Sequence, residues 1–182
     1  MAKQAIKESA ANLEMLLTIL KGTQDQVRFA DSKAAFVTGF NSLLFGFIIS
    51  HADKLIAVPV TARTAPFWIA SSLLMLYGVA MATSIGFVIA SIISRFGHMA
   101  PPCKVHFGHI TKHYGKDYAR YYRDASGMSD ADWAGEVGSQ IVEVSHIATT
   151  KHQLVSRAAL FTIAAFILWV AGFVAMMHVP RP

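Results

Sequence analysis

The sequence predicts an all-α membrane protein in which three transmembrane helices carry cytoplasmic helical extensions. Hydrophobic residues make up 54% of its 182 residues and charged residues 15%, whereas soluble chains average about 25% charged residues. The charged residues also leave three long gaps. Nineteen residues without Asp, Glu, Lys or Arg follow Lys33, thirty-one follow Arg63, and twenty-three follow Arg157.

Two of these gaps exceed the length needed to cross a bilayer and the first comes close to it, because a hydrocarbon core of about 30 Å requires about 20 helical residues. In chain order, we expect a cytoplasmic amphipathic helix, a first span, a short outer loop, a second span with a cytoplasmic extension, a cytoplasmic helical segment and a third span. Their ranges are 1–33, 34–52, 53–65, 66–94, 95–157 and 158–179. The first span is the least apolar and would be predicted to be a buried helix if it stood alone.

The distribution of basic residues predicts an orientation with the amino terminus inside and the carboxyl terminus outside. Five of the sixteen Lys and Arg residues lie in 1–33 and eight in 95–157, and three spans would place these thirteen on one side of the membrane. The positive-inside rule assigns that side to the cytoplasm. Acidic lipid headgroups suffice as partners for the net charge of +5, so no nucleic acid polymer is expected.

The amino-terminal region and the cysteine content set two further expectations. The first 33 residues hold nine charged residues and no long apolar run, so we expect no cleavable signal peptide. The single cysteine, Cys103, excludes an intramolecular disulfide.

Heptad spacing predicts that two cytoplasmic helices pack against each other in parallel. Apolar residues recur in steps of three and four in 5–34 and again in 133–157. Asp31 and Lys151 fall on these two seams and differ by about 6 Å in their distance from the spans, so we predict an ion pair between them. Alternatively, both side chains point to phosphate or water, where ion pairs are weak. The apolar seam positions are Ile6, Ala10, Leu13, Leu17, Leu20, Val27 and Ala34, and Val137, Ile141, Val144, Ala148 and Val155.

Rows of small residues predict close helix packing within the membrane. Such residues recur every fourth position in the first and second spans, and these rows let helix backbones approach closely. Three spans cannot easily enclose a channel, so conduction would require a homo-oligomer. Packing within one chain remains the alternative, and we favour it for at least one row. The candidate residues for a pore or for helix packing are Asn41, Gly46, Gly78 and Gly86.

The histidines and the motif content argue against a metal site and against an enzyme. His106, His109 and His113 would share a helix face, but Gly108 and Gly115 weaken that helix, and no carboxylate lies between Arg95 and Asp117. No serine elbow, phosphate loop or HExxH motif is present. We therefore expect no metal, no cofactor and no catalytic residue.

Three motifs, taken in order, resemble the transmembrane effectors of Pycsar antiphage defence. The first is RFADSKA at 28–34 and the second HFGHI at 106–110. The third runs from Gln140 through SHIA at 145–148 to Lys151 and the Arg-Ala pair at 157–158. His152 stands where such proteins often have tyrosine.

The resemblance implies an antiphage effector in the bacterial cell inner membrane, crossing it several times. Infection would activate a neighbouring cyclase, and a cyclic pyrimidine mononucleotide such as cUMP or cCMP would rise. The effector would then impair inner-membrane integrity, causing death or arrest of the infected cell. A passive oligomeric membrane scaffold without ligand sensing is the alternative function.

A receptor for such a nucleotide needs cations for the phosphodiester and a flat surface for the base. Lys112, Lys116 and Arg120 would form a helical stripe at i, i+4 and i+8, with tyrosines beside it. The alternative is an interfacial anchor, with cations on headgroups and rings at the bilayer surface. The candidate ligand-binding residues are Arg28, Lys33, Lys112, Lys116, Tyr118, Arg120 and Arg157.

Overall fold

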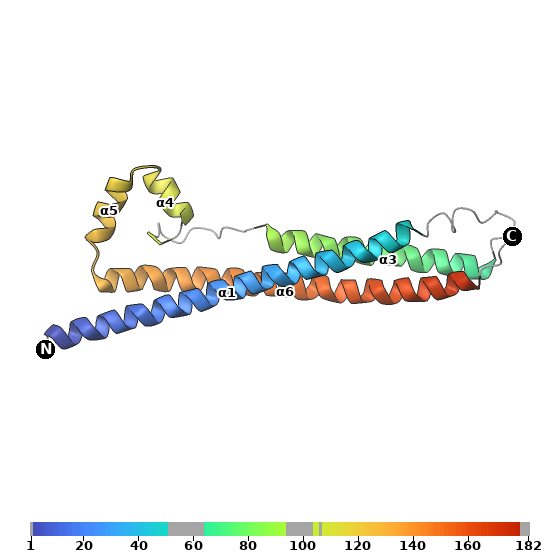
Figure 1. The fold of residues 1–182 in the computed structure, drawn as a ribbon, viewed down its shortest axis with the longest axis horizontal. Helices are drawn as coiled ribbons and strands as arrows, with labels where there is room; N and C mark the ends of the chain where they lie inside the picture. The colour runs from blue at the N-terminus through green and yellow to red at the C-terminus, as the bar shows by residue number, and fades with distance from the viewer. Residues whose placement is uncertain (1, 51–63, 94–103, 106, 179–182) are drawn as a thin grey trace. The chain divides into compact units, whose positions relative to one another are not determined.

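The computed structural model describes residues 2–50, 64–93, 104, 105 and 107–178, and all of its regular structure in these residues is α-helical (Figure 1). The all-α class is therefore confirmed. The helices are α1 (Ala2–Ile49), α3 (Ala65–Ile92), α4 (Phe107–Tyr114), α5 (Tyr118–Ser126) and α6 (Asp130–Met177).

The three long helices confirm the prediction of three membrane spans. Asn12–Ile49, Ala65–Ile92 and Asp130–Met177 are each long and apolar enough to cross a membrane. A proline in the first turn of α3 is consistent with the start of this helix. Proline has no backbone N–H to donate, and the N–H groups of the first helical turn have no partner within the helix. The 28 residues of α3 rise about 42 Å. The predicted extension of this span beyond Ile93, and most of the outer loop 53–65, lie outside the described residues.

The chain divides into two compact units. Unit 1 comprises 1–29 and 94–150, and unit 2 comprises 30–93 and 151–182. Helices α1 and α6 are each 48 residues long and contribute to both units. Unit 1 adds the short helices α4 and α5, and unit 2 adds α3.

The core of unit 1 follows the predicted heptad seams with one difference. Leu20, Val137 and Val144 are buried together. Leu16 packs against this cluster, whereas the seam residue predicted from the sequence, Leu17, is 48% exposed. Steps of three and four both keep a residue near one helix face, so the spacing alone could not separate these adjacent leucines. The other residues packed against the cluster are Leu13, Val27, Val105 and Ile141.

The core of unit 2 joins the three membrane-spanning helices through small and medium side chains. Ala34, Val88 and Ala158 belong to one buried cluster, and Tyr77 and Ala165 belong to a second. Ala158 and Ala165 are both fully buried. Small residues at these positions let the backbones approach closely, which favours helix association in lipid.

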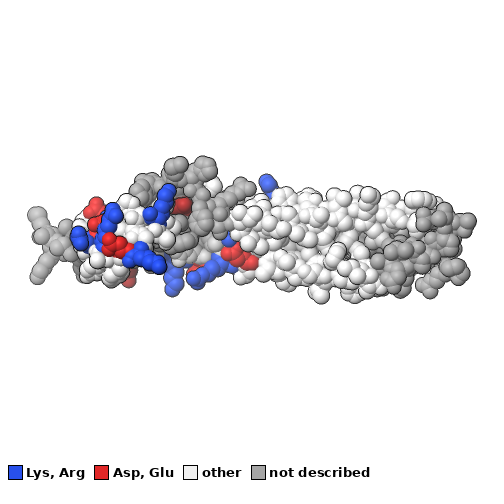
Figure 2. Space-filling model, turned by 90° about the horizontal axis from the view of Figure 1, so that it is seen from above, with Lys and Arg blue, Asp and Glu red and all other residues white. Residues whose placement is uncertain are grey.

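The outward surface of unit 2 is apolar. Large side chains such as Phe36, Leu43 and Met75 are strongly exposed, and white atoms dominate the surface of the spans in Figure 2. The charged residues that the structure describes in this unit lie where α1 and α6 enter it. They are Asp31, Lys33, Lys151 and Arg157. This distribution suits hydrocarbon around the spans.

Candidate functional site

Three buried polar side chains, one from each membrane-spanning helix, meet inside unit 2. Asn41 Nδ2 donates to Ser84 Oγ at 3.0 Å, and Asn41 Oδ1 accepts from Thr162 Oγ1 at 3.1 Å. The Ser84 hydroxyl also lies 2.8 Å from Thr162 Oγ1 and donates to the Ala158 carbonyl at 2.9 Å. A bilayer offers no water to such groups, so they must find partners within the protein. We call Asn41, Ser84 and Thr162 the polar triad.

The triad places Asn41 in helix packing within one chain. Asn41 is 3% exposed, and both the nitrogen and the oxygen of its side-chain amide are hydrogen-bonded to neighbouring helices. Of these three residues, the sequence predicts a role in a pore or in helix packing for Asn41 alone. It does not identify Ser84 and Thr162, although each carries a hydroxyl within an otherwise apolar span.

Replacing Asn41 with Leu is expected to destabilise unit 2 by about 1 kcal/mol, a typical value for a hydrogen-bonded side chain between membrane helices. Ser84 and Thr162 keep each other and the Ala158 carbonyl as partners, so the loss stays modest. Unfolding by titration with SDS measures it. The matched control is Ser42→Leu at the adjacent, exposed position. Equal losses in the two variants would contradict the role of the triad.

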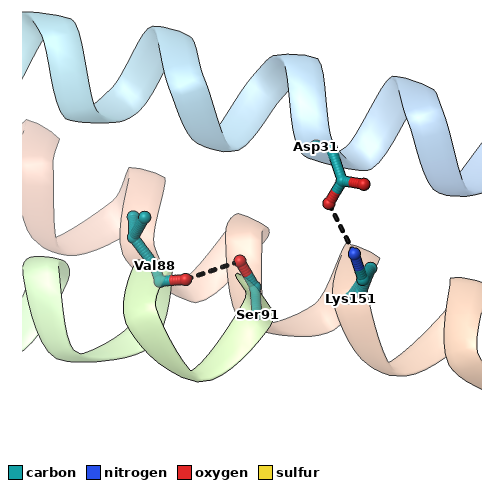
Figure 3. Close-up of polar contacts among 4 residues, drawn as sticks. All are labelled: Asp31, Val88, Ser91 and Lys151. Atoms are coloured by element: carbon teal, nitrogen blue, oxygen red, sulfur yellow. Dashed lines mark hydrogen bonds and ion pairs between the residues drawn. The ribbon is translucent and has the colours of Figure 1, made fainter. Parts of the chain in front are cut away.

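A second polar contact lies where α1 and α6 enter unit 2. Lys151 Nζ lies 2.6 Å from Asp31 Oδ1, and Figure 3 shows the two side chains pointing toward each other from neighbouring helices. The lysine side chain is 11% exposed and the aspartate 49% exposed. Nearby on α3, the buried Ser91 hydroxyl donates to the Val88 carbonyl of its own helix. The structure thus brings Asp31 and Lys151 together, with the ammonium as the more deeply buried partner.

The glycines expected in helix packing face away from the bundle. Gly46, Gly78 and Gly86 are exposed, and a methyl group added at any of them would meet no atom within 4 Å. The expectation that one of these rows packs within the chain is therefore wrong. The close approach occurs instead at Gly172, where an added methyl would lie 3.3 Å from Leu74 Cδ2.

The predicted cationic stripe is not one helical face, because the helix breaks in its middle. Helix α4 ends at Tyr114, and α5 begins at Tyr118. Gly115 between them has a φ of 57°, a conformation that glycine adopts without strain. Asp117 then caps α5 by accepting from the Arg120 amide at 3.0 Å. The expectation of one continuous stripe through Lys112, Lys116 and Arg120 is therefore wrong.

Helices α4 and α5 instead form a small aromatic head, which we define as residues 107–126. The Tyr114 and Tyr121 rings meet edge to face at 5.2 Å, and the Arg120 guanidinium lies 5.6 Å from the Tyr114 ring. The Tyr114 hydroxyl donates to Asp124 Oδ2 at 3.3 Å. Burial raises the pKa of Tyr114, and the Asp124 carboxylate raises it further. Tyr114 is therefore a protonated donor at neutral pH.

An exposed part of the α5 surface presents aromatic rings to solvent. Tyr118 and Tyr122 stack with their centroids 6.0 Å apart, and they are 72% and 60% exposed. They lie four residues apart, which places them on one helix face. This face is a ready surface for a flat ligand.

A cavity of about 680 Å³ lies between α5, the start of α6 and Lys104. Its charged lining residues are Lys104, Arg123, Asp124, Asp132 and Glu136. Glu136 accepts from the Lys104 amide at 2.9 Å, and Lys104 Nζ donates to the Asp124 carbonyl at 3.3 Å. Three carboxylates against two cations make this cavity unfavourable for an anion.

The start of α6 is fixed by a reciprocal cap beside this cavity. Asp132 Oδ2 accepts from the Ser129 hydroxyl at 2.6 Å and from the Ser129 amide at 2.9 Å, while the Asp132 amide donates to Ser129 Oγ at 3.2 Å. This is the capping-box arrangement with Asp in place of Glu. The hydrogen bond from the Ser129 hydroxyl and then that from its amide hold the pKa of Asp132 below its ordinary value.

The cap predicts a pH dependence for the start of α6. Because the folded pKa of Asp132 is lowered, its contribution to stability is present above the unfolded pKa of about 4. The contribution is lost as the pH falls through the lower folded pKa. Ser129→Ala should raise the pKa of Asp132 toward its ordinary value, as measured by NMR titration of its carboxyl carbon. Ser126→Ala is the control and should leave it unchanged; an equal pKa in wild type and Ser129→Ala would refute the cap.

The remaining predicted ligand residues are distributed over both units. Unit 1 contains Arg28, whose guanidinium lies 3.5 Å from Asp25 Oδ1, as well as the residues of the aromatic head. Lys33 and Arg157 belong to unit 2. The described residues contain no cluster of three or more metal-binding side chains; His106 lies outside them.

These features define a helical membrane protein in which three spans are joined by buried polar contacts and a separate helical unit carries an aromatic head. A family model, the Pycsar effector protein domain, matches residues 15–177. The chain therefore belongs to the Pycsar effector family and is an antiphage defence effector with transmembrane helices. The family implies a cyclic nucleotide signal from a partner cyclase. Searches of curated proteins and of solved structures found no significant match.

Proposed function

We propose that the chain senses a cyclic pyrimidine mononucleotide, cUMP or cCMP, and responds by impairing the bacterial inner membrane. The family match supports this proposal, since it covers both the spans and the aromatic head. In this proposal the amino terminus lies in the cytoplasm and the carboxyl terminus outside, and the chain has no enzymatic activity. Abortive infection follows from the loss of membrane integrity.

The aromatic head is the ligand surface that the geometry favours most. The exposed Tyr118 and Tyr122 rings can stack on a pyrimidine base, and Lys112, Lys116 and Arg120 on the same head can receive the phosphodiester. The cavity beside Lys104 fits the charge of the ligand less well, because carboxylates outnumber cations in its lining.

Isothermal titration of the full chain in detergent with cUMP, cCMP and cAMP tests this assignment. Tyr118→Ala is expected to weaken pyrimidine nucleotide binding about tenfold, since a base stacked on an aromatic side chain contributes about 1–3 kcal/mol. Lys21→Gln, an exposed cation of α1 outside the head, is the control. No heat from either pyrimidine nucleotide would overturn direct sensing. An equal loss of nucleotide affinity in both variants would show that the aromatic head is not the binding site.

Membrane damage is tested separately in cells that produce the chain with its cognate cyclase. Depolarisation and dye entry that require cyclase activity support the effector function. Unchanged permeability supports the alternative, a passive oligomeric scaffold.

Homo-oligomerisation is part of the proposal, because three spans do not easily enclose an aqueous path. The outward rows that contain Gly46, Gly78 and Gly86 leave room for close contact with a second copy. Gly78→Leu should reduce the oligomer fraction in detergent, as measured by light scattering. Ala164→Leu, at an exposed position of α6, is the control.

A further inference from the structure

Unit 2 contains a groove of about 620 Å³ between α1 and α6. Asp31 contacts Lys151, and ten residues further along α1, Asn41 contacts Thr162. The two helices therefore run in the same direction, and the residues with which each enters unit 2 line the same end of the groove.

The groove has a polar end and an apolar remainder. The polar end lies where the two helices enter unit 2 and is lined by Ser32, Lys33, His152 and Ser156. Phe40 and Ile163 line the groove further along the helices. From residue 33 to residue 40 the rise is about 10 Å, and from 152 to 163 about 16 Å.

The apolar walls are open to the surroundings of the spans. Phe36, which lines the groove, is 76% exposed, and Ile163 is 57% exposed. Both belong to helices that are long and apolar enough to cross a membrane. In a bilayer such walls face hydrocarbon, so the apolar part of the groove suits an acyl chain.

The polar end adds a charge preference to this apolar path. The charged residues that the structure describes in unit 2 are three cations and one anion, all near this end. Lys33 lines the groove itself, and the side chains of Ser32, His152 and Ser156 bring hydrogen-bonding groups beside it. Basic pockets between membrane helices bind anionic lipid headgroups in this way.

We propose that this groove binds an anionic phospholipid. Its phosphate lies at Lys33 and His152, and one acyl chain extends past Phe36 and Phe40 toward Ile163. A second copy of the chain fits less well, because the anion that the structure describes in its unit 2, Asp31, is already paired with Lys151. The proposal does not depend on nucleotide sensing.

Native mass spectrometry of the full chain in a neutral detergent tests the site. The probes are phosphatidylglycerol, phosphatidylcholine with the same acyl chains, and glycerol phosphate. Lys33→Gln is expected to weaken phosphatidylglycerol binding about fivefold, the contribution of one cation near a lipid surface. It should weaken phosphatidylcholine binding less, because the choline cation offsets the charge of that lipid's phosphate. Lys21→Gln, on the same helix in unit 1, should change neither.

A second pair of variants tests the acyl-chain path. Ala159 lines the groove, so Ala159→Trp should fill it and remove binding of both lipids, whereas Ala164→Trp at an exposed site of the same helix should not. Glycerol phosphate should not displace phosphatidylglycerol, because it lacks the chain; displacement would assign the site to a free phosphate. Equal wild-type affinity for the two lipids, or equal effects of Lys33→Gln and Lys21→Gln, would overturn the proposal. Loss of a dimer in Ala159→Trp without loss of lipid would assign the groove to a second copy.

Discussion

Asp31→Asn is expected to destabilise unit 2 by about 2 kcal/mol. Breaking a fully buried ion pair by removing one partner costs about 3–5 kcal/mol, because the other charge stays buried without compensation. The Lys151 side chain is 11% exposed, so it approaches that limit. The aspartate is 49% exposed and water screens it, which reduces the expected loss. Unfolding of the full chain by SDS measures the effect.

The unequal burial of the two partners predicts unequal losses. Lys151→Met leaves an aspartate that water can reach, so its loss should be about 1 kcal/mol or less. Asp25→Asn is the control, since Asp25 pairs with Arg28 at an exposed site. Reversing both charges, as Asp31→Lys with Lys151→Asp, should recover stability that either single reversal loses. A loss for Asp31→Asn no larger than that for Asp25→Asn would contradict this account.

Ala158→Leu is the second substitution for which we expect a loss of about 2 kcal/mol. Ala158 is fully buried beside Ala34 and Val88, and extra methylene groups in a packed core cost about 1–3 kcal/mol. The Ser84 hydroxyl donates to the Ala158 carbonyl at 2.9 Å, so displacing α3 would also strain the polar triad. The same SDS titration applies.

Ala164→Leu provides the matched control for this substitution. Ala164 lies on the same helix but faces outward, where a larger apolar side chain meets lipid. It should change stability by less than about 0.5 kcal/mol. Equal losses at the two positions would show that α6 does not pack through Ala158.

The membrane architecture could be predicted from the sequence because a bilayer imposes its own length scale. An uncharged stretch of about 20 residues has few alternatives once three occur in one chain. The contact between Asp31 and Lys151 could be predicted from the sequence for a related reason, because both residues interrupt heptad seams at comparable distances from their spans.

The polar triad and the aromatic head could not be predicted in the same way. The second span carries several hydroxyl groups, including Ser72, Thr83 and Ser84. Because this span is apolar on all sides, its sequence does not show which face points inward, so Ser84 could not be singled out. For the same reason, glycines that face outward were predicted to pack between helices. In the head, the break at Gly115 and the cap at Asp117 were signalled by a turn-forming Gly-Lys-Asp sequence, but the spacing of cations masked it.

The polar triad has a consequence for assembly. The outward Leu, Phe and Ile side chains of the spans would tolerate sliding of one helix past another, since hydrocarbon contacts them equally well at any depth. A slide of one helical turn, about 5.4 Å, would separate Asn41 from Ser84 or Thr162. Their polar groups would then be left without hydrogen-bond partners in an apolar environment. The triad therefore selects one axial register of the three helices as the bundle forms.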